Sequence, residues 1–216
     1  MVLTATLNFD QMKSASVSSR VMGRVERLCY KNLGDYVKKG SALYEIYSED
    51  LNNAKQEYIL ALDKKKVFAD ESVIDFDQLI QSARNKLLLW GLSEALIAEL
   101  TQSKKATPTT TFYSTAGGYI TQLDIREGDY IMEGGTIIKL ADLSALWAEA
   151  QVYTSQMAEI NSNSVAIVQL PDFDNKEIKG KIEFVNPEIN PDTRINLIRV
   201  SIPNPGNQLK PGMPAY

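Results

Sequence analysis

The 216-residue sequence predicts a mostly β fold that is interrupted by an inserted α-helical hairpin. Three observations support this prediction. A stretch of glycines, turn residues and alternating apolar residues occurs twice in the chain. Between the two copies, the hydrophobic period changes from that of strands to that of helices. Several short apolar runs separated by Pro, Gly and Asn follow the second copy.

The repeat is clearest in residues 34–40, Gly-Asp-Tyr-Val-Lys-Lys-Gly, and residues 128–134, Gly-Asp-Tyr-Ile-Met-Glu-Gly. Upstream, residues 23–28 match residues 118–123 when a gap of one residue is allowed in the alignment. Each copy predicts a strand, a tight Gly-Asp turn, a short strand, a Gly turn and another strand. Because each copy has one apolar face, the two are expected to cover each other as a small sandwich. The alternative is two unrelated β-hairpins that share Gly-Asp-Tyr.

The segment between the copies predicts helices. Ser48 is a suitable N-cap, and a helix is expected from there to about Val67, followed by a second helix that ends at Gly91 and a short one that starts at Ser93. Two such helices joined by a short loop form an antiparallel hairpin. Its apolar stripe is narrow, and these polar residues are expected on its other faces: Asn52, Lys55, Glu57, Asp63, Lys64 and Lys66.

A separate β module is expected after residue 143. Strands are predicted near residues 145–152, 165–168, 178–184 and 195–202, which suggests a small barrel or sandwich. The opening strand at residues 2–9 has no partner nearby and is assigned to this barrel. The predicted domains are therefore residues 13–48 with 106–142 for the split sandwich, 49–105 for the hairpin, and 1–12 with 143–216 for a β-barrel truncated at its C-terminus.

Composition argues against several classes of function. The net charge is −4 and the longest basic run is residues 64–66, so no nucleic-acid partner is expected. The chain has no histidine and a single cysteine, Cys29, which excludes Ser-His and Cys-His nucleophile pairs and an internal disulfide. Cys29 lies in an alternating pattern and is expected to be buried. Acidic pairs such as Glu49-Asp50 lie at helix starts or turns, where carboxylates cap the backbone. We therefore expect no catalytic activity and no cofactor.

A set of short motifs, in a fixed order, covers almost the whole chain. They are residues 23–25, 34–40, Leu43, Leu51 with 54–58, 87–93, Gly117-Gly118, Gly128-Asp129, 141–144 with Leu146-Trp147, Thr193-Arg194, and Asn204-Pro205 followed by 209–213. Together they resemble the membrane fusion proteins (HlyD-like), the periplasmic adaptors of tripartite efflux pumps driven by transporters of the resistance-nodulation-division (RND) class. The resemblance is strongest to the heavy-metal (copper/silver, CusB-like) branch.

This resemblance implies a lipoyl-like barrel-sandwich hybrid plus a small β-barrel in an elongated multi-module chain. It implies a non-enzymatic adaptor that links an inner-membrane RND transporter to an outer-membrane channel for efflux of metal ions or drugs. It also implies a homo-oligomeric ring, trimer or hexamer, in the periplasm. The alternatives are an adaptor of an ABC-type export system and a lipoyl or biotinyl carrier domain. Such carriers present a modified lysine on the turn between the two halves, and here helices occupy that junction.

The same resemblance suggests two kinds of site. The hairpin end is expected to contact the outer-membrane channel, and its predicted residues are Lys64, Lys65, Lys66, Phe68, Asp70 and Glu71. The alternative is a merely solvated loop. Thioethers suit soft cations such as Cu(I) and Ag(I), so Met12 and Met22 are candidate metal ligands, although such methionines also fill gaps in cores.

The chain opens on an alternating pattern and stops shortly after a turn at residues 209–213. It contains no signal peptide and no apolar run long enough to cross a bilayer. We therefore expect it to be part of a longer protein whose inner-membrane anchor lies outside these residues.

Overall fold

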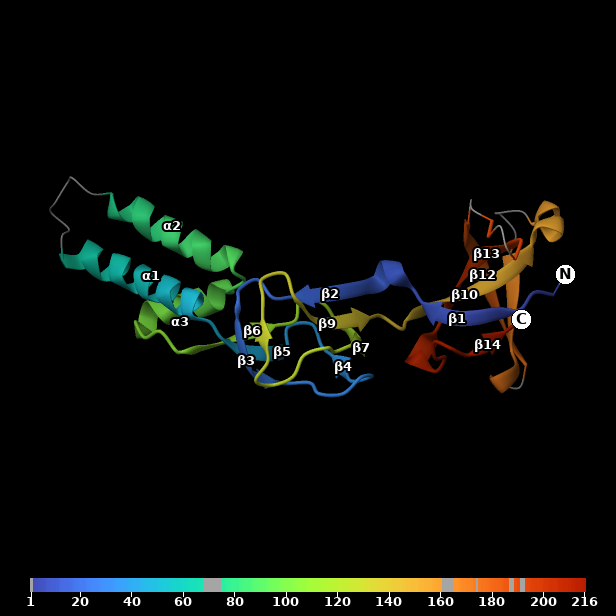
Figure 1. Ribbon diagram of the computed structural model, residues 1–216, viewed down its shortest axis with the longest axis horizontal. Helices are drawn as coiled ribbons and strands as arrows, with labels where there is room; N and C mark the ends of the chain where they lie inside the picture. The colour runs from blue at the N-terminus through green and yellow to red at the C-terminus, as the bar shows by residue number, and fades with distance from the viewer. Residues whose placement is uncertain (1, 68–74, 161–164, 174, 187–188, 191–192) are drawn as a thin grey trace. The chain divides into compact units, whose positions relative to one another are not determined.

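A computed structural model describes residues 2–67, 75–160, 165–173, 175–186, 189–190 and 193–216. The chain divides into two units (Figure 1), residues 16–140 and residues 1–15 with 141–216. We call them the sandwich unit and the barrel unit. None of the helices in the described part of the chain has the length and apolar character needed to cross a membrane.

The sandwich unit contains two four-stranded sheets. In one sheet the strand order is β2 (Ser14–Ser18), β9 (Thr136–Ala141), β7 (Gly118–Gln122) and β4 (Tyr36–Val37). In the other it is β6 (Thr109–Tyr113), β5 (Ala42–Tyr47), β3 (Gly23–Leu28) and β8 (Tyr130–Ile131). The pairs β3–β5, β3–β8, β4–β7 and β5–β6 are antiparallel.

The two repeat copies exchange their short strands. β4 of the first copy pairs with β7 of the second, and β8 of the second pairs with β3 of the first. The backbone bonds are reciprocal: Gly34 N–H donates to Ile120 O at 2.8 Å, and Gly128 N–H donates to Val25 O at 2.7 Å. Both glycines have left-handed φ values, 85° and 94°, as tight turns require. The copies are therefore halves of one sandwich and not two independent hairpins.

Apolar side chains from both copies fill the sandwich. Val25, Leu43, Ile46, Ile137, Ile138 and Leu140 are fully buried. Tyr44 is also buried, and its ring stacks on Phe112 with the centroids 5.1 Å apart. Burial raises the pKa of the Tyr44 phenol to about 12. Cys29, which we expected to be buried, is only partly so, because it lies one residue beyond the end of β3.

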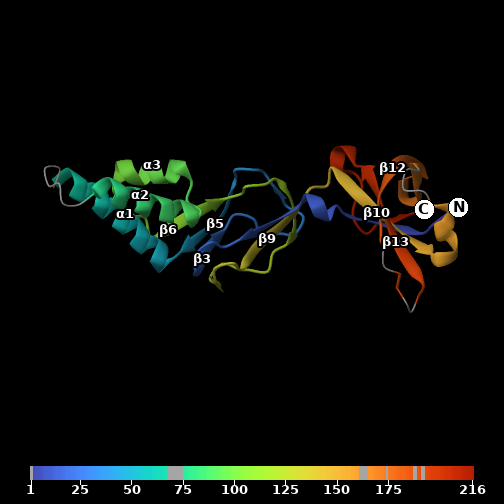
Figure 2. The ribbon, with the colours of Figure 1, turned by 90° about the horizontal axis from the view of Figure 1, so that it is seen from above.

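In the described residues, three helices lie between β5 and β6. They are α1 (Glu49–Val67), α2 (Phe76–Leu89) and α3 (Glu94–Ser103), and α1 and α2 run side by side (Figures 1 and 2). The predicted cap is present, since Ser48 Oγ accepts from Leu51 N–H. The helical insertion begins after Tyr47, the last residue of β5, and ends before Thr109, the first residue of β6. Tyr47 and Thr109 are paired across the two strands. The helices thus replace a β-turn.

The barrel unit is one six-stranded sheet. Its order is β11 (Val165–Leu170), β12 (Lys176–Val185), β13 (Ile195–Pro203), β10 (Ala145–Tyr153), β1 (Ala5–Phe9) and β14 (Pro214–Ala215). Two backbone bonds between Gln169 and Tyr216, 2.8 and 3.0 Å long, join the two edges of the sheet. The sheet is therefore closed. The opening strand of the chain lies inside it, between β10 and β14.

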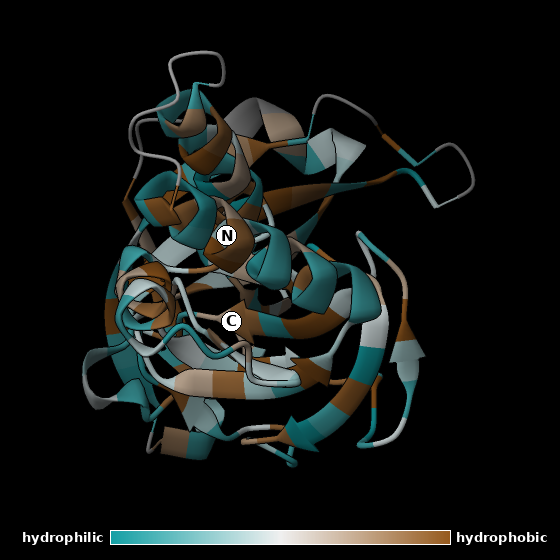
Figure 3. Ribbon diagram, turned by 90° about the vertical axis from the view of Figure 1, so that its left-hand side faces the viewer, coloured by the Kyte–Doolittle hydropathy of each residue, from teal (hydrophilic) through white to brown (hydrophobic). Residues whose placement is uncertain are grey.

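Short 3₁₀ helices join several of these strands: η1 (Gln11–Lys13), η2 (Thr154–Glu159), η3 (Pro171–Phe173) and η4 (Pro205–Asn207). Hydrophobic and hydrophilic residues alternate along many of the strands (Figure 3), which is the pattern of a sheet with one face in a core and the other in water.

Candidate functional site

The predicted partner-binding lysines lie at the end of the hairpin, where α1 stops. Residues 64–66 form its last turn and their side chains are exposed. Lys65 Nζ forms an ion pair with the carboxylate of Asp77, in the first turn of α2. Positive charge at this end also complements the dipole of α1. The other predicted residues lie outside the described part of the chain: Phe68, Asp70 and Glu71. Contact of this surface with a partner stays a prediction.

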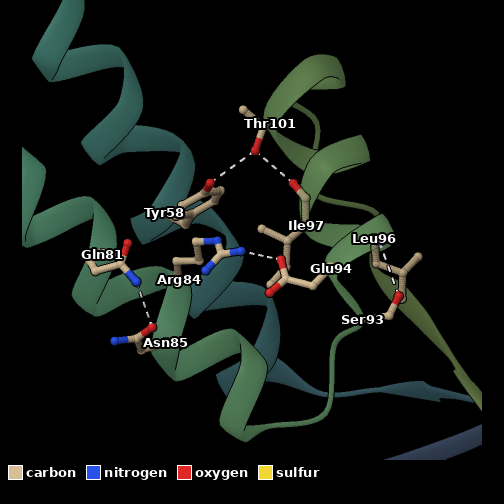
Figure 4. A network of polar contacts seen from close by, with 9 residues as sticks. All are labelled: Tyr58, Gln81, Arg84, Asn85, Ser93, Glu94, Leu96, Ile97 and Thr101. Carbon is tan, nitrogen blue, oxygen red and sulfur yellow. Dashed lines mark hydrogen bonds and ion pairs between the residues drawn. The ribbon is translucent and has the colours of Figure 1, made fainter.

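Polar contacts tie the helices together behind this end (Figure 4). Tyr58 Oη and Thr101 Oγ1 are 3.0 Å apart and join α1 to α3. Arg84 of α2 forms an ion pair with Glu94 of α3. These contacts join α3 to both α1 and α2. The three helices in the described part of the hairpin therefore stabilise one another.

The base of the hairpin is anchored by a buried lysine. Lys55 is only 4% exposed, and its Nζ donates to Thr110 Oγ1 at 2.6 Å and to Thr107 O at 3.0 Å. One turn earlier, Asn52 Nδ2 donates to Pro108 O at 2.8 Å. These bonds attach α1 to the returning chain just before and within β6. No carboxylate pairs with the Lys55 ammonium in the described residues, and burial lowers its pKa from 10.5 to about 8.

The prediction that Lys55 lies on an outer face of the hairpin is wrong. Lys55 follows Leu51 by four residues and precedes Tyr58 by three, so it belongs to the stripe that α1 buries. That spacing is visible in the sequence, but residue type alone suggested an exposed position. A cavity of about 440 Å³ lies beside Lys55, and the charged residues Glu99 and Lys105 also line it.

The two candidate metal ligands belong to different units. Met12 lies in η1 of the barrel unit and is 86% exposed. Met22 lies just before β3 of the sandwich unit and is 38% exposed. Neither side chain is buried, so neither fills a gap in a core. No group of three or more His, Cys, Asp and Glu side chains in the described residues is arranged to hold a metal ion. The metal role of Met12 and Met22 stays a prediction.

A cation–π cluster on the barrel was not predicted from the sequence. The Arg199 guanidinium lies 4.7 Å from the ring centroid of Trp147 and 5.4 Å from that of Phe184. Its Nε is 2.9 Å from an oxygen of Glu149. These residues come from β10, β12 and β13, so the cluster joins three neighbouring strands. We interpret it as a stabilising element of the barrel.

Family models match both units of the chain. The CusB barrel-sandwich hybrid domain matches residues 14–141, more than half of the chain. The chain belongs to the CusB family. A CusB-like beta-barrel domain matches residues 145–216. These matches confirm the predicted fold class, a mostly β chain with a barrel-sandwich hybrid, an inserted helical hairpin and a β-barrel.

Individual relatives agree with the CusB family assignment. The chain is 24% identical over 213 residues to the cation efflux system protein CusB of Escherichia coli K12, with 98% of this chain and 50% of that protein covered. It is 28% identical over 227 residues to the cation efflux system protein CzcB of Alcaligenes sp., with 96% and 42% covered. The chain thus spans about half the length of the curated relatives it matches.

Solved structures show the same fold. The crystal structure of ZneB from Cupriavidus metallidurans aligns with a TM-score of 0.63 and 25% identity, covering 99% of this chain and 94% of that one. MacA from Actinobacillus actinomycetemcomitans aligns with a TM-score of 0.58 and 20% identity, covering 100% and 76%.

Proposed function

We propose that this chain is the central part of a periplasmic adaptor that links an inner-membrane RND transporter to an outer-membrane channel for metal-ion efflux. The observation that carries the proposal is the chain order itself. One sandwich is split by a helical hairpin and followed by a closed barrel, and the CusB family models match both β units. The matched relatives CusB and CzcB carry the name cation efflux system protein, which supports metal ions over drugs as the cargo.

Within this proposal each part has a distinct role. The hairpin end contacts the outer-membrane channel, and the barrel side faces the transporter. The exposed lysines at residues 64–66 and the bracing between the helices support the first role, because a contact arm has to be stiff and to carry an accessible charged surface. The adaptor works as a ring of identical copies and is anchored to the inner membrane by a segment outside these residues. Catalysis has no part in this function.

Two alternatives are separable by simple observations. An adaptor of an ABC-type exporter would be encoded beside an ATP-binding-cassette transporter and not beside a proton-driven RND transporter. A lipoyl or biotinyl carrier would show added mass on a lysine after native expression. The carrier is disfavoured because the junction at Tyr47 and Thr109, where a carrier has its lysine turn, leads into the helices.

The test removes the hairpin and keeps the sandwich. Because Tyr47 and Thr109 are paired, residues 48–108 are replaceable by an Asn-Gly turn that continues the β5–β6 ladder. In the full-length protein, this replacement is expected to abolish co-purification with the outer-membrane channel and to leave transporter binding intact. Channel binding at the level of the unaltered protein would refute the proposed role of the hairpin.

A second variant addresses the hairpin end. Reversing all three charges, Lys64→Glu with Lys65→Glu and Lys66→Glu, is expected to weaken channel binding without unfolding the arm. The matched control reverses three exposed lysines of β12 in the barrel, at residues 176, 179 and 181. Equal losses of channel binding in the two triple variants would show that channel binding depends on the net charge of the protein and not on the hairpin end.

A further inference from the structure

The amine of Lys55 is buried among neutral groups at the base of the hairpin. The side chain is 4% exposed, and its Nζ donates to Thr110 Oγ1 at 2.6 Å, to Thr107 O at 3.0 Å and to Asn52 Oδ1 at 3.4 Å. None of these three acceptors carries a charge, so in the described part of the chain the ammonium has hydrogen bonds but no counter-ion. Burial without an opposite charge disfavours the ammonium and favours the neutral amine.

The cavity of about 440 Å³ beside Lys55 gives small molecules access to this amine. Its volume is many times the roughly 30 Å³ that a water molecule occupies in the liquid, so a triatomic molecule fits easily. The lining includes the apolar residues Leu96 and Leu100 of α3 and the hydroxyl groups of residues 109–111. A small uncharged molecule can therefore enter the cavity without the cost of desolvating a charge.

Three other titratable groups line the same cavity: Glu99 of α3, Lys105 just after α3, and Tyr113 of β6. Glu99 and Lys105 are exposed, so the cavity reaches the surface of the protein. Lys105 supplies a positive charge for an anion formed on Lys55 Nζ, and Glu99 opposes such an anion. The hydroxyl of Thr110 accepts from the ammonium and can instead donate to an anion, because a hydroxyl group does both.

We propose that Lys55 is a modification site, at which the neutral amine reacts with carbon dioxide to form a carbamate. The nitrogen lone pair attacks the carbon of CO₂, one C=O electron pair moves to oxygen, and the nitrogen releases a proton to solvent. The product is R–NH–COO⁻, which keeps one N–H for Thr107 O. Burial lowers the pKa of Lys55 from 10.5 to about 8, so its neutral fraction at pH 7.5 is about 200 times that of an amine with a pKa of 10.5. The reaction changes the charge at the anchor of α1 from positive to negative and goes beyond the proposed function.

The test equilibrates the full-length protein with bicarbonate at pH 7.5 and then adds triethyloxonium tetrafluoroborate, which converts carbamates into stable ethyl esters. Digestion and mass spectrometry locate each modified lysine in the same sample. The adduct at Lys55 is expected to exceed that at Lys39, an exposed lysine of the sandwich unit, by at least about 10-fold. In guanidinium chloride, where the cavity is lost, the adduct at Lys55 is expected to fall to the level at Lys39.

Two variants at exposed positions test the charges of the cavity. Lys105→Gln is expected to lower the amount of the Lys55 adduct by up to about 5-fold, and Glu99→Gln is expected to raise it by a similar factor. Changes of the same sign in both variants would contradict the role of Lys105.

Equal adducts at Lys55 and Lys39 in the folded protein would overturn the site, as would an adduct at Lys55 that is unchanged by unfolding. Because the wild-type chain is compared with itself, neither result depends on a variant that fails to fold. The measurement does not involve the outer-membrane channel, so failure here leaves the channel-binding test and the proposed function untouched.

Discussion

The stability of the sandwich unit is expected to rise with pH because of Lys55. The folded state lowers the pKa of this lysine to about 8, whereas the unfolded chain keeps it near 10.5. The charged form is therefore disfavoured in the fold, and this penalty is fully present below pH 8. As the pH rises from 8 toward 10.5, the folded protein loses the proton first and the penalty disappears. A Lys55→Met variant has no such group and no such pH dependence.

The expected size of this stability change follows from the folded and unfolded pKa values of Lys55. One pKa unit corresponds to about 1.4 kcal/mol, so the full penalty is about 3 kcal/mol. Between pH 7 and pH 9.5, the free energy of unfolding of the wild-type chain should rise by about 2 kcal/mol relative to Lys55→Met. Other groups that titrate in this range are present in both proteins, so their contributions cancel in the difference. The hydrogen bonds from Lys55 to Thr107 and Thr110 add a constant to the difference in unfolding free energy between the two proteins. They do not determine how this difference changes with pH.

The assay is urea denaturation followed by tryptophan fluorescence. Trp90 lies at the end of α2 and Trp147 in the barrel unit, so a Trp147→Phe background reports on the sandwich unit alone. Lys39→Met, at an exposed lysine of the sandwich unit, sets the baseline for removing one positive charge. If the unfolding free energies of wild type and Lys55→Met change by the same amount from pH 7 to pH 9.5, the ammonium of Lys55 is not desolvated and the prediction is wrong.

Three other variants test separate parts of the structure. Arg199→Ala is expected to lower the unfolding free energy of the barrel by about 1–2 kcal/mol, because the cation–π contacts and the ion pair disappear together; unchanged Trp147 fluorescence and melting would contradict this. Gly34→Ala and Gly128→Ala are each expected to cost about 1–2 kcal/mol, since both glycines have left-handed φ values with open space around them. Denaturation should give similar values for the two, and clearly different values would count against their equivalence in the repeat. Lys65→Ala is expected to change stability by less than about 1 kcal/mol, because its ion pair with Asp77 is exposed, and thermal melting checks this.

Local signals in the sequence predicted the fold class well. The two Gly-Asp turns require positive φ, and alternating apolar residues on both sides of each turn leave few alternatives to short strands. The helices were equally predictable, because Ser48 and Ser93 are caps and the apolar spacing between them is helical. Such features depend on residues that are close in sequence, where the chemistry of a residue and its neighbours is sufficient.

The candidate sites were less predictable, because their residues come from distant parts of the chain. Met12 and Met22 were proposed from the sequence as metal ligands, and only the structure shows that they are exposed and belong to different units. Lys55 was misassigned because charged residues are usually exposed, and its acceptors Thr107 and Thr110 lie more than 50 residues away. Contact of the lysines at residues 64–66 with a partner still awaits the experiments above.

By itself, the sequence determined that this chain has a repeated β half, an inserted helical arm and a further β module, because turns, caps and hydrophobic periods are local properties. Only the tertiary structure decided that the two copies exchange β4 and β8, that Tyr216 closes the barrel against Gln169, and that Lys55 is buried. The physical reason is that pairing between distant strands depends on which apolar faces cover each other, and this is a property of the whole folded chain.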